Sequence, residues 1–319
     1  MNQLIAVLGA TATGKSALGL RLAERLGGEI VNCDSTAVYR GFDIGTDKVP
    51  LHDRRGIPHH LIDIVDPTTE YTAADYGRDA AAVIREIHAR GRVPILVGGT
   101  GFYYRALTRG LFPGPGKNAE LRDRLEAMAD RRGAAFLWRM VRRVDPHSAD
   151  RILPGDRKRL IRALEVFFQT GRPLTDHFAD TVSPLGDEVA VTAIGLRLDA
   201  TAIARRVARR VDAQFAAGLL DEVRGLLARG VHESARPFGG LVYRQVMDHL
   251  RGVRDLDVTR ALIVQGNRRY ARRQLIWFRK EPTLMWFDGP GESPEVQARV
   301  LRWLAERGLL IDGGLAAHA

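Results

Sequence analysis

The sequence predicts an α/β fold in which a doubly wound parallel sheet carries a helical insertion domain. Short apolar segments alternate with segments of helical periodicity, and this alternation favours parallel strands joined by crossover helices. A Pro/Gly-rich stretch at residues 111–116 marks a change in composition, and the sequence from about 118 to 178 is helical and basic without a convincing strand. We therefore expect a core in two parts, residues 1–112 and 189–319, with the insertion domain at residues 113–188.

The first expected element is a buried strand that leads into a phosphate-binding loop. Residues 4–8 form a short apolar run, typical of a strand buried on both faces. Gly9–Ser16 follows at once and matches the pattern G-x4-G-K-S/T, and leucines then recur every four residues until Gly27 ends the helix. Strand, loop and helix are the context that this motif requires. The core is therefore expected to resemble that of P-loop NTPases.

The remaining core elements are short strands separated by helices. Strands are expected at Glu29–Cys33, at residues 60–65 and at residues 94–97, with a helix at about 72–90. Strand character returns at residues 189–198, and helices then follow to the end, interrupted by a short apolar run at 284–287.

Functional residues follow three of these strands at the points where they end. Gly9–Ser16 follows the first strand, Asp34 and Ser35 follow the second, and Thr100 comes after the strand at 94–97. Ligands of doubly wound sheets bind beyond the carboxyl ends of the strands. We therefore expect these residues to meet in one crevice.

The phosphate-binding loop indicates what this crevice can hold. In such loops backbone N–H groups, the helix N-terminus and Lys15 surround a phosphate, and Ser16 can hold Mg²⁺. A hydrolysing NTPase normally adds an acidic residue at the end of a core strand and a group that orients water, but glycines follow the strand at 94–97. The acidic residue is instead Asp34, which could coordinate a metal, accept a proton from a nucleophile or cap a turn. This pattern favours group transfer over hydrolysis.

The composition excludes several classes of protein and leaves a polyanionic partner open. Of 319 residues, 45% are hydrophobic, and 48 Lys and Arg against 38 Asp and Glu give a net charge of +10. The single cysteine, Cys33, excludes an intramolecular disulfide and a multi-cysteine metal site, and the nine histidines lack metal-ligand spacing. No apolar stretch is long enough to cross a membrane and no signal peptide is evident. We expect a soluble, cytoplasmic protein.

Positive charge gathers in three segments that could contact an RNA backbone. Residues 122–143 hold seven arginines, Arg157–Arg162 form a second group, and residues 268–280 form a third, which is interleaved with aromatic residues. Each segment could be an ordinary solvated helix face. Three in one chain favour a footprint for RNA, and the aromatic side chains could stack on bases or pack in the core.

Several longer motifs resemble the tRNA dimethylallyltransferases, the tRNA isopentenyltransferase family. Gly9–Ser16 is similar to that family's G-P-T-A-S-G-K-T loop. The segment from Asp34-Ser35 through Asp43-Ile44-Gly45-Thr46 to Lys48 resembles its D-S-x-x-x-Y-x-G-x-D-I-G-T-x-K block, which is far more specific than the loop. Further matches follow in the family's order along nearly the whole chain, at His59–Asp63, Tyr71–Asp75, Val97–Tyr103, Arg159–Glu165, Tyr243–Gln245 and Arg272–Arg279.

The resemblance implies a reaction and a diphosphate site. Members transfer a dimethylallyl group from dimethylallyl diphosphate to N6 of the adenosine just 3′ of the tRNA anticodon. The diphosphate would lie in the loop with Mg²⁺ at Ser16. Arg210, on a helix that begins near Ala200, is the implied clamp, and Arg206 lies four residues earlier on the same face. The implied diphosphate contacts are Gly9, Ala10, Thr11, Ala12, Thr13, Gly14, Lys15, Ser16 and Arg210.

The resemblance also implies the roles of two residues in the reaction. Asp34 would accept the proton from N6, and Thr100 would position the nucleophile or the bridging oxygen. Cations and N–H groups of the loop would stabilise the charge that forms on the leaving diphosphate, and the adenine must leave its stack to reach them. Because this reaction does not use water as the nucleophile, the family has no need of the water-orienting group of a hydrolysing NTPase.

The insertion domain of the family grips the anticodon stem-loop. The expected partners are thus tRNA and dimethylallyl diphosphate, without a membrane, and the chain is expected to act as a monomer. The implied tRNA contacts are Asp34, Ser35, Thr36, Ala37, Thr100, Arg122, Lys158, Arg159, Leu160, Ile161, Arg162, Gly240, Leu241, Val242, Tyr243, Arg244, Arg272, Arg273, Gln274 and Arg279.

The sequence departs from the family pattern at two positions, and three other functions stay open as alternatives. Many members carry Gln at the position of Ala37, and most read Gly-Tyr-Arg/Lys where this chain has Val242-Tyr243-Arg244. A small-molecule kinase that uses ATP would explain the loop but not the basic insertion. Prenyl transfer to free adenine nucleotides would not need the C-terminal basic helices, and a nucleotide-switched RNA-binding protein would tolerate the loss of Asp34.

Overall fold

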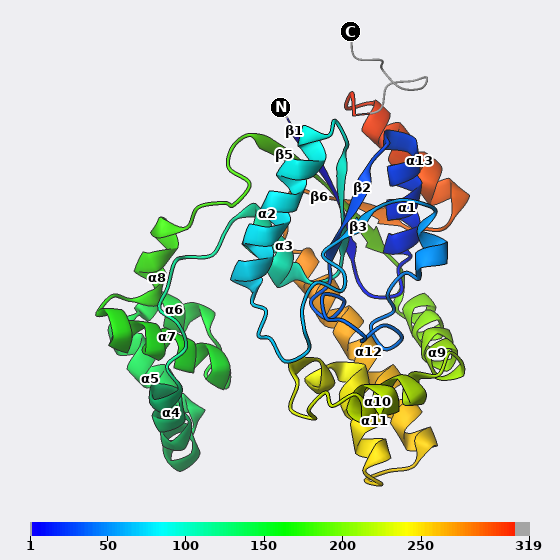
Figure 1. Cartoon of the computed structure of the whole chain (residues 1–319). Helices are drawn as coiled ribbons and strands as arrows, with labels where there is room; N and C mark the ends of the chain where they lie inside the picture. The colour runs from blue at the N-terminus through cyan, green and yellow to red at the C-terminus, as the bar shows by residue number, and fades with distance from the viewer. Residues whose placement is uncertain (1, 310–319) are drawn as a thin grey trace. The chain divides into compact units, whose positions relative to one another are not determined.

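The strands of the chain form one six-stranded sheet in which all neighbouring strands run parallel (Figure 1). The structure is a computed structural model and describes residues 2–309. The strand order β3-β2-β4-β1-β5-β6 confirms the predicted doubly wound sheet. The strands are β1 (Asn2–Gly9), β2 (Glu29–Cys33), β3 (His59–His60), β4 (Pro94–Gly98), β5 (Val189–Arg197) and β6 (Leu284–Asp288).

Helices cover both faces of this sheet (Figure 1). On one face Leu18 and Leu22 of α1 pack in the same apolar cluster as Val296 and Val300 of α13. On the other face α2, α3 and α12 contribute to a larger cluster. Because both faces are covered, the central strands are continuous apolar runs. The helices are α1 (Lys15–Leu26), α2 (Ala73–Ala89), α3 (Gly101–Thr108), α9 (Ala200–Ala216), α10 (Leu219–Ala228), α11 (Leu241–Leu250), α12 (Leu256–Phe278) and α13 (Pro294–Ala305), with 3₁₀ turns η1 (Leu51–Arg54) and η3 (Arg236–Gly239).

The register of the strands brings three strand ends to one edge of the sheet. Leu8 of β1 pairs with Gly98 of β4, and Cys33 of β2 pairs with the same glycine from the other side. A Cβ atom at Gly98 would lie 2.1 Å from the carbonyl oxygen of Cys33, so the close approach of these strands requires glycine. Cys33 itself is buried, as predicted. The segments after β1, β2 and β4 therefore start side by side.

The predicted strand at residues 60–65 is much shorter in the structure. β3 consists of His59 and His60 alone, and the chain then turns because Leu61 and Asp63 adopt φ angles of 59° and 58°. Left-handed residues cannot continue a strand. The side-chain amide of Asn32 donates a hydrogen bond to the carbonyl oxygen of Leu61 at 2.9 Å, which holds this turn against β2.

The chain divides into two compact units. The sheet unit runs up to Thr108 and resumes at Leu185, and the helical unit spans Arg109–Pro184. The helical unit contains no strand, and its core includes Leu125, Leu137 and Leu164. No helix within residues 2–309 is long and apolar enough to cross a bilayer. The elements of the helical unit are α4 (Ala119–Arg132), α5 (Ala134–Val144), α6 (Pro146–Arg151), α7 (Arg157–Thr170), α8 (Leu174–His177) and η2 (Phe178–Asp180).

Candidate functional site

A crevice of about 490 Å³ lies at the carboxyl edge of the sheet, inside the sheet unit. The phosphate-binding loop after β1 forms part of its lining, together with Asp34 after β2 and Gly99 after β4. Arg210 of α9 and Tyr270 of α12 complete the same lining. The sequence prediction that these strand ends meet in one crevice is thus confirmed for the loop and Asp34.

The loop has the backbone shape of a phosphate cradle. Gly14 has a φ of 86°, and a Cβ atom there would lie 2.7 Å from the backbone nitrogen of Gly291, so only glycine fits. Ala12 is also left-handed, with a φ of 63°. The hydroxyl of Thr13 donates to the carbonyl oxygen of Ala10 at 2.9 Å and braces the turn from inside.

Side chains from distant elements hold this loop in place. Gln274 of α12 is buried; its Oε1 accepts from the N–H of Thr11 and its Nε2 donates to the carbonyl oxygen of Gly99, both at 2.8 Å. Arg206 of α9 donates to the carbonyl oxygen of Ala12 at 2.5 Å and forms an ion pair with Glu292. Gln274 therefore ties the phosphate loop to the segment that carries Thr100.

Two cations face the crevice. Lys15 Nζ donates to the carbonyl oxygen of Ala10 at 2.7 Å. Burial lowers the pKa of Lys15, and the neighbouring charge of Arg210 lowers it further; Asp34 and Asp47 oppose the change, and the resulting pKa is about 8. Arg210 Nη1 donates to Thr11 Oγ1 at 2.9 Å and lies 2.8 Å from Asp47 Oδ2. Both cations thus touch the loop where an anion would bind.

Asp34 uses one carboxylate oxygen to shape its own turn. Oδ1 accepts hydrogen bonds from the N–H and hydroxyl of Thr36, at 2.8 and 2.6 Å, and from the N–H of Ala37 at 3.3 Å. Among the described residues, Oδ2 has no hydrogen-bond partner. The turn-capping role and a role for the second oxygen are therefore compatible, because they use different atoms of one side chain.

Thr100 is linked to the residue that follows Asp34 by a hydrogen bond to its backbone. Its hydroxyl oxygen accepts a hydrogen bond from the N–H of Ser35 at 3.1 Å. Tyr270 lines the same crevice, and burial together with the negative charge of Asp34 raises the pKa of Tyr270 to about 12. Tyr270 therefore stays protonated and can act as a donor near Thr100 and Asp34.

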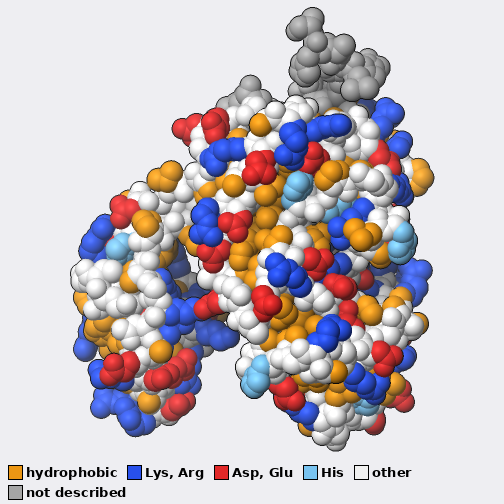
Figure 2. Space-filling model, in the orientation of Figure 1, with side chains coloured by type: hydrophobic (Ala, Val, Ile, Leu, Met, Phe, Trp, Pro, Cys, Tyr) orange, Lys and Arg blue, Asp and Glu red, His pale blue; other side chains and the backbone are white. Residues whose placement is uncertain are grey.

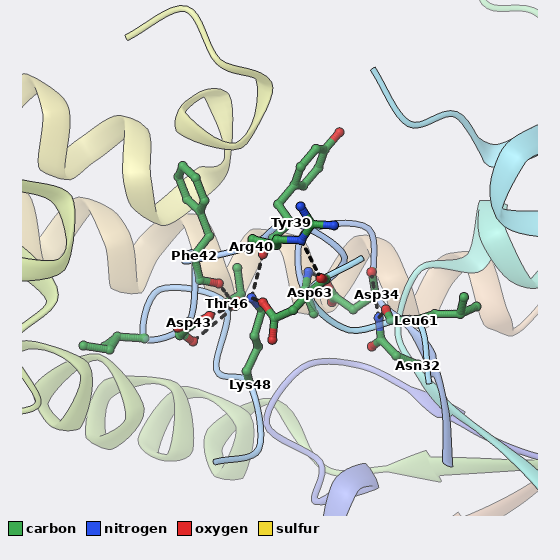
Figure 3. Close-up of polar contacts among 12 residues, drawn as sticks. Asn32, Asp34, Tyr39, Arg40, Phe42, Asp43, Thr46, Lys48, Leu61 and Asp63 are labelled. Carbon is green, nitrogen blue, oxygen red and sulfur yellow. Dashed lines mark hydrogen bonds and ion pairs between the residues drawn. The ribbon is translucent and has the colours of Figure 1, made fainter. Parts of the chain in front are cut away.

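The loop that follows Asp34 is braced by ion pairs between the buried side chain of Lys48 and two partly exposed carboxylates (Figure 3). The Lys48 side chain is 4% exposed, and its ammonium lies 2.7 Å from Asp43 and 2.5 Å from Asp63. It also donates to the carbonyl oxygen of Tyr39 at 2.6 Å. Glu222 of α10 accepts hydrogen bonds from three successive N–H groups at residues 43–45.

The predicted RNA contacts fall into three groups by the exposure of their side chains. Six have side chains that are buried in the protein: Ala37, Leu160, Ile161, Val242, Tyr243 and Gln274. Six basic side chains are exposed: Lys158, Arg159, Arg244, Arg272, Arg273 and Arg279. The remaining predicted contacts that are only partly buried are Asp34, Ser35, Thr36, Thr100, Arg122, Arg162, Gly240 and Leu241.

Arg122 and Arg162 are already engaged within the helical unit. Arg122 binds the carboxylate of Glu165 through Nε and Nη2, at 2.7 and 2.8 Å, and Arg162 Nη1 lies 2.7 Å from the same carboxylate. Figure 2 shows that Lys and Arg side chains are spread over the visible face of the molecule among acidic side chains. Although the two signs are mixed, the helical unit has an excess of positive charge, with 15 Lys and Arg against 10 Asp and Glu.

Sequence reasoning missed Asp47 and Glu222. It named Tyr270 only as one of the aromatic residues of a basic segment that could stack on bases or pack, and it assigned Gln274 to RNA. Tyr270 and Gln274 are four residues apart, and this helical spacing was the available signal that both face the crevice. Asp47 and Glu222 act across long sequence separations, so no local pattern marks them. Within residues 2–309 no three His, Cys, Asp or Glu side chains cluster as a metal site.

Comparison with known proteins adds independent evidence. The model of the IPP transferase family matches residues 37–281. The tRNA dimethylallyltransferase of Geobacter metallireducens is 45% identical and covers 94% of this chain and 97% of its own length. That of Solibacter usitatus is 46% identical, with 95% and 98% covered.

Two solved structures share the fold. The full-length tRNA isopentenylpyrophosphate transferase from Bacillus halodurans superposes with a TM-score of 0.69 at 35% identity, covering 97% of this chain and 98% of its own. A eukaryotic dimethylallyltransferase acting on tRNA has a TM-score of 0.79 at 25% identity, with 97% and 79% covered.

Proposed function

The chain belongs to the IPP transferase family, and we propose from this premise how its crevice carries out the reaction. Its activity is that of a tRNA dimethylallyltransferase, which prenylates the adenosine 3′ of the anticodon. The observation that carries the assignment to this crevice is Asp34, whose Oδ2 has no hydrogen-bond partner within residues 2–309, in a lining shared with Lys15 and Arg210.

The diphosphate of the donor is assigned to the phosphate-binding loop. Lys15, Arg210 and the N–H groups at the start of α1 supply positive charge there. When the allylic C–O bond breaks, its electron pair goes to the diphosphate oxygen. Fixed cations and donors that stabilise this growing charge lower the barrier to transfer.

Mg²⁺ is proposed to enter with the diphosphate. Ser16 is exposed at the start of α1 in the crevice lining, and its hydroxyl is the hard oxygen donor that Mg²⁺ accepts. Because the described residues hold no carboxylate cluster, the protein would supply few ligands, and phosphate oxygens and water would supply the others. The ion would add positive charge beside the leaving group.

Asp34 is proposed as the base and Thr100 as a positioning residue. N6 of adenine forms a bond to the allylic carbon and loses a proton, which Asp34 Oδ2 accepts. Oδ1 stays bonded to Thr36, so the carboxylate keeps its orientation. Thr100, whose hydroxyl oxygen accepts from the N–H of Ser35, the residue after Asp34, would orient the incoming amine.

The tRNA is proposed to bind through the exposed basic residues of α7, α11 and α12. Arg272 and Arg273 of α12, and Arg279 at its C-cap, are exposed close to Gln274, which reaches the phosphate loop. Lys158 and Arg159 of α7 would contact the anticodon stem. Since tRNA is the acceptor, we place the protein in the cytoplasm.

The direct test mixes the protein with Mg²⁺, dimethylallyl diphosphate and unmodified tRNA, followed by nuclease digestion and mass analysis. We expect isopentenyl adenosine, and none with a matched tRNA that carries guanosine at that position. Absence of the modified nucleoside would refute the proposal. Phosphoryl transfer from ATP without RNA would instead favour a kinase.

A further inference from the structure

Arg210, the cation assigned to the diphosphate, is already paired with a carboxylate of the protein. Its Nη1 lies 2.8 Å from Asp47 Oδ2, and the two side chains are 31% and 38% exposed. Both residues line the crevice together with Lys15 and Ser16. An internal anion thus lies at the place where the donor's anionic group is expected.

The backbone presents Asp47 to Arg210 by a braced turn. Asp47 has a φ of 60°, a left-handed conformation that is uncommon outside glycine, Asn and Asp. Thr46, before it, donates from its hydroxyl to the carbonyl oxygen of Phe42 at 2.5 Å, and Lys48, after it, binds Asp43 and Asp63. Both neighbours of Asp47 are therefore held by contacts within the protein.

The contact differs from the other arginine contact of α9. Arg206 is tied to a backbone carbonyl of the loop as well as to Glu292, so it supports the loop itself. Among the described residues, the hydrogen-bond and ion-pair partners of Arg210 are two side chains, Thr11 and Asp47. A diphosphate offers more charge and more acceptor oxygens than one carboxylate, so it can take the place of Asp47 on this guanidinium.

We propose that Asp47 competes with diphosphate for Arg210 and thereby weakens the hold of the crevice on its diphosphate product. The competition rests on the proposed function, because it takes the loop and Arg210 as the diphosphate site. Its consequence is faster release of diphosphate after transfer, a step that limits turnover in many enzymes. The alternative is that Asp47 orients Arg210 for the ligand, in which case its loss would weaken binding.

The test measures the affinity of inorganic diphosphate, with Mg²⁺ present, by titration calorimetry. For Asp47→Asn, which keeps the shape and removes the charge, we expect binding about fivefold tighter than in the wild type. The gain should shrink as salt is raised, because screening weakens partly exposed charge pairs. Product inhibition by diphosphate should strengthen in parallel.

The matched control is Asp53→Asn, because Asp53 lines the same crevice and is 62% exposed beside His52 rather than Arg210. Its effect should stay within about twofold. In an Arg210→Gln background, Asp47→Asn should lose its effect, since the pair would already be absent. Thermal denaturation of each variant checks that the fold is retained.

Unchanged or weaker binding by Asp47→Asn would overturn the proposal, as would an equal gain in the Arg210→Gln background. Failure of wild type and variant alike to bind diphosphate would refute the diphosphate site of the proposed function, and the competition with it. Binding by the wild type without a gain in the variant would refute the competition alone.

Discussion

Two charged clusters in this molecule are built from similar side chains and differ in how completely these are paired. In the helical unit, Glu165 is fully buried, and its carboxylate receives hydrogen bonds from Arg122, Arg162 and the N–H of Asn118. In the crevice of the sheet unit, Asp34 leaves Oδ2 without a partner among residues 2–309, and Lys15 binds only a carbonyl oxygen.

The difference shows in the pKa values of the two clusters. Burial would raise the pKa of Glu165, but the hydrogen bonds from Arg122, Arg162 and Asn118 outweigh it and lower the pKa to about 2. Burial and the charge of Arg210 lower the pKa of Lys15 to about 8. A fully paired cluster stabilises one conformation, whereas an incompletely paired one favours an added anion.

The largest expected effect is at Asp34, the carboxylate with a free oxygen. Asp34→Asn keeps an Oδ1 acceptor for the turn and removes the base, so transfer should slow by about 10²- to 10⁴-fold. Affinity for tRNA should change only a few-fold. Single-turnover rates and tRNA titrations measure the two quantities. If the rate survives, Asp34 serves only to cap its turn.

Removal of the Glu165 carboxylate should lower the stability of the fold rather than the rate of transfer. Glu165→Gln leaves two guanidinium groups without their shared anion, and the free energy of unfolding should fall by about 3 kcal/mol. Denaturant titration measures it. Glu126→Gln, at a carboxylate that is 45% exposed beside Arg157, is the control and should cost under about 1 kcal/mol.

The stability that Glu165 supplies should also depend on pH in a defined direction. Its pKa in the folded protein lies below the ordinary carboxyl value, so the contribution is present above about 4.5 and is lost as the pH falls toward about 2. In Glu165→Gln this component of the acid dependence should be absent. An identical acid profile for both proteins would contradict the comparison.

The ion pairs of Lys48 test the same comparison, because Lys48 is fully paired like Glu165 but lies in the lining of the crevice. Lys48→Met removes the ammonium between Asp43 and Asp63, and we expect a loss of about 2 kcal/mol in the free energy of unfolding. The exposed Lys280→Met should change it by less than about 0.5 kcal/mol. Equal losses would show that the network contributes nothing.

The smallest expected effect is the pH dependence of diphosphate affinity. A bound anion favours protonated Lys15, whose pKa without ligand is about 8, so affinity should be highest below that pH. It should fall by up to about tenfold for each pH unit above it. Lys15→Arg keeps its charge throughout this range and reports any ionisation of the ligand itself. Parallel profiles for both proteins would refute the role of Lys15.

Much of the fold could be predicted because it depends on local patterns. The apolar runs at residues 4–8 and 29–33 form β1 and β2, and the expected helix at about 72–90 is α2 with Thr72 as its N-cap. The strand expected at 60–65 failed because two left-handed residues, Leu61 and Asp63, interrupt it. Apolar alternation does not reveal such a turn.

The candidate site likewise contains residues that local sequence patterns reveal and residues that they do not. The phosphate loop and Asp34 could be found in sequence because each follows a strand of a parallel sheet, whose carboxyl ends meet at one edge. The role of Gln274 could not, because it joins Thr11 to Gly99 from a position 263 residues away from Thr11 in the chain.

The sequence by itself thus determined the parallel sheet, the phosphate loop and the chemical type of each cluster, because these depend on residue order and spacing. Only the tertiary structure decided which charges are paired. Asp47 reaches Arg210, and Arg122 reaches Glu165, because packing of the helices and loops brings distant segments together. The physical reason is that a charge acts over a few ångströms in space, whatever the separation along the chain.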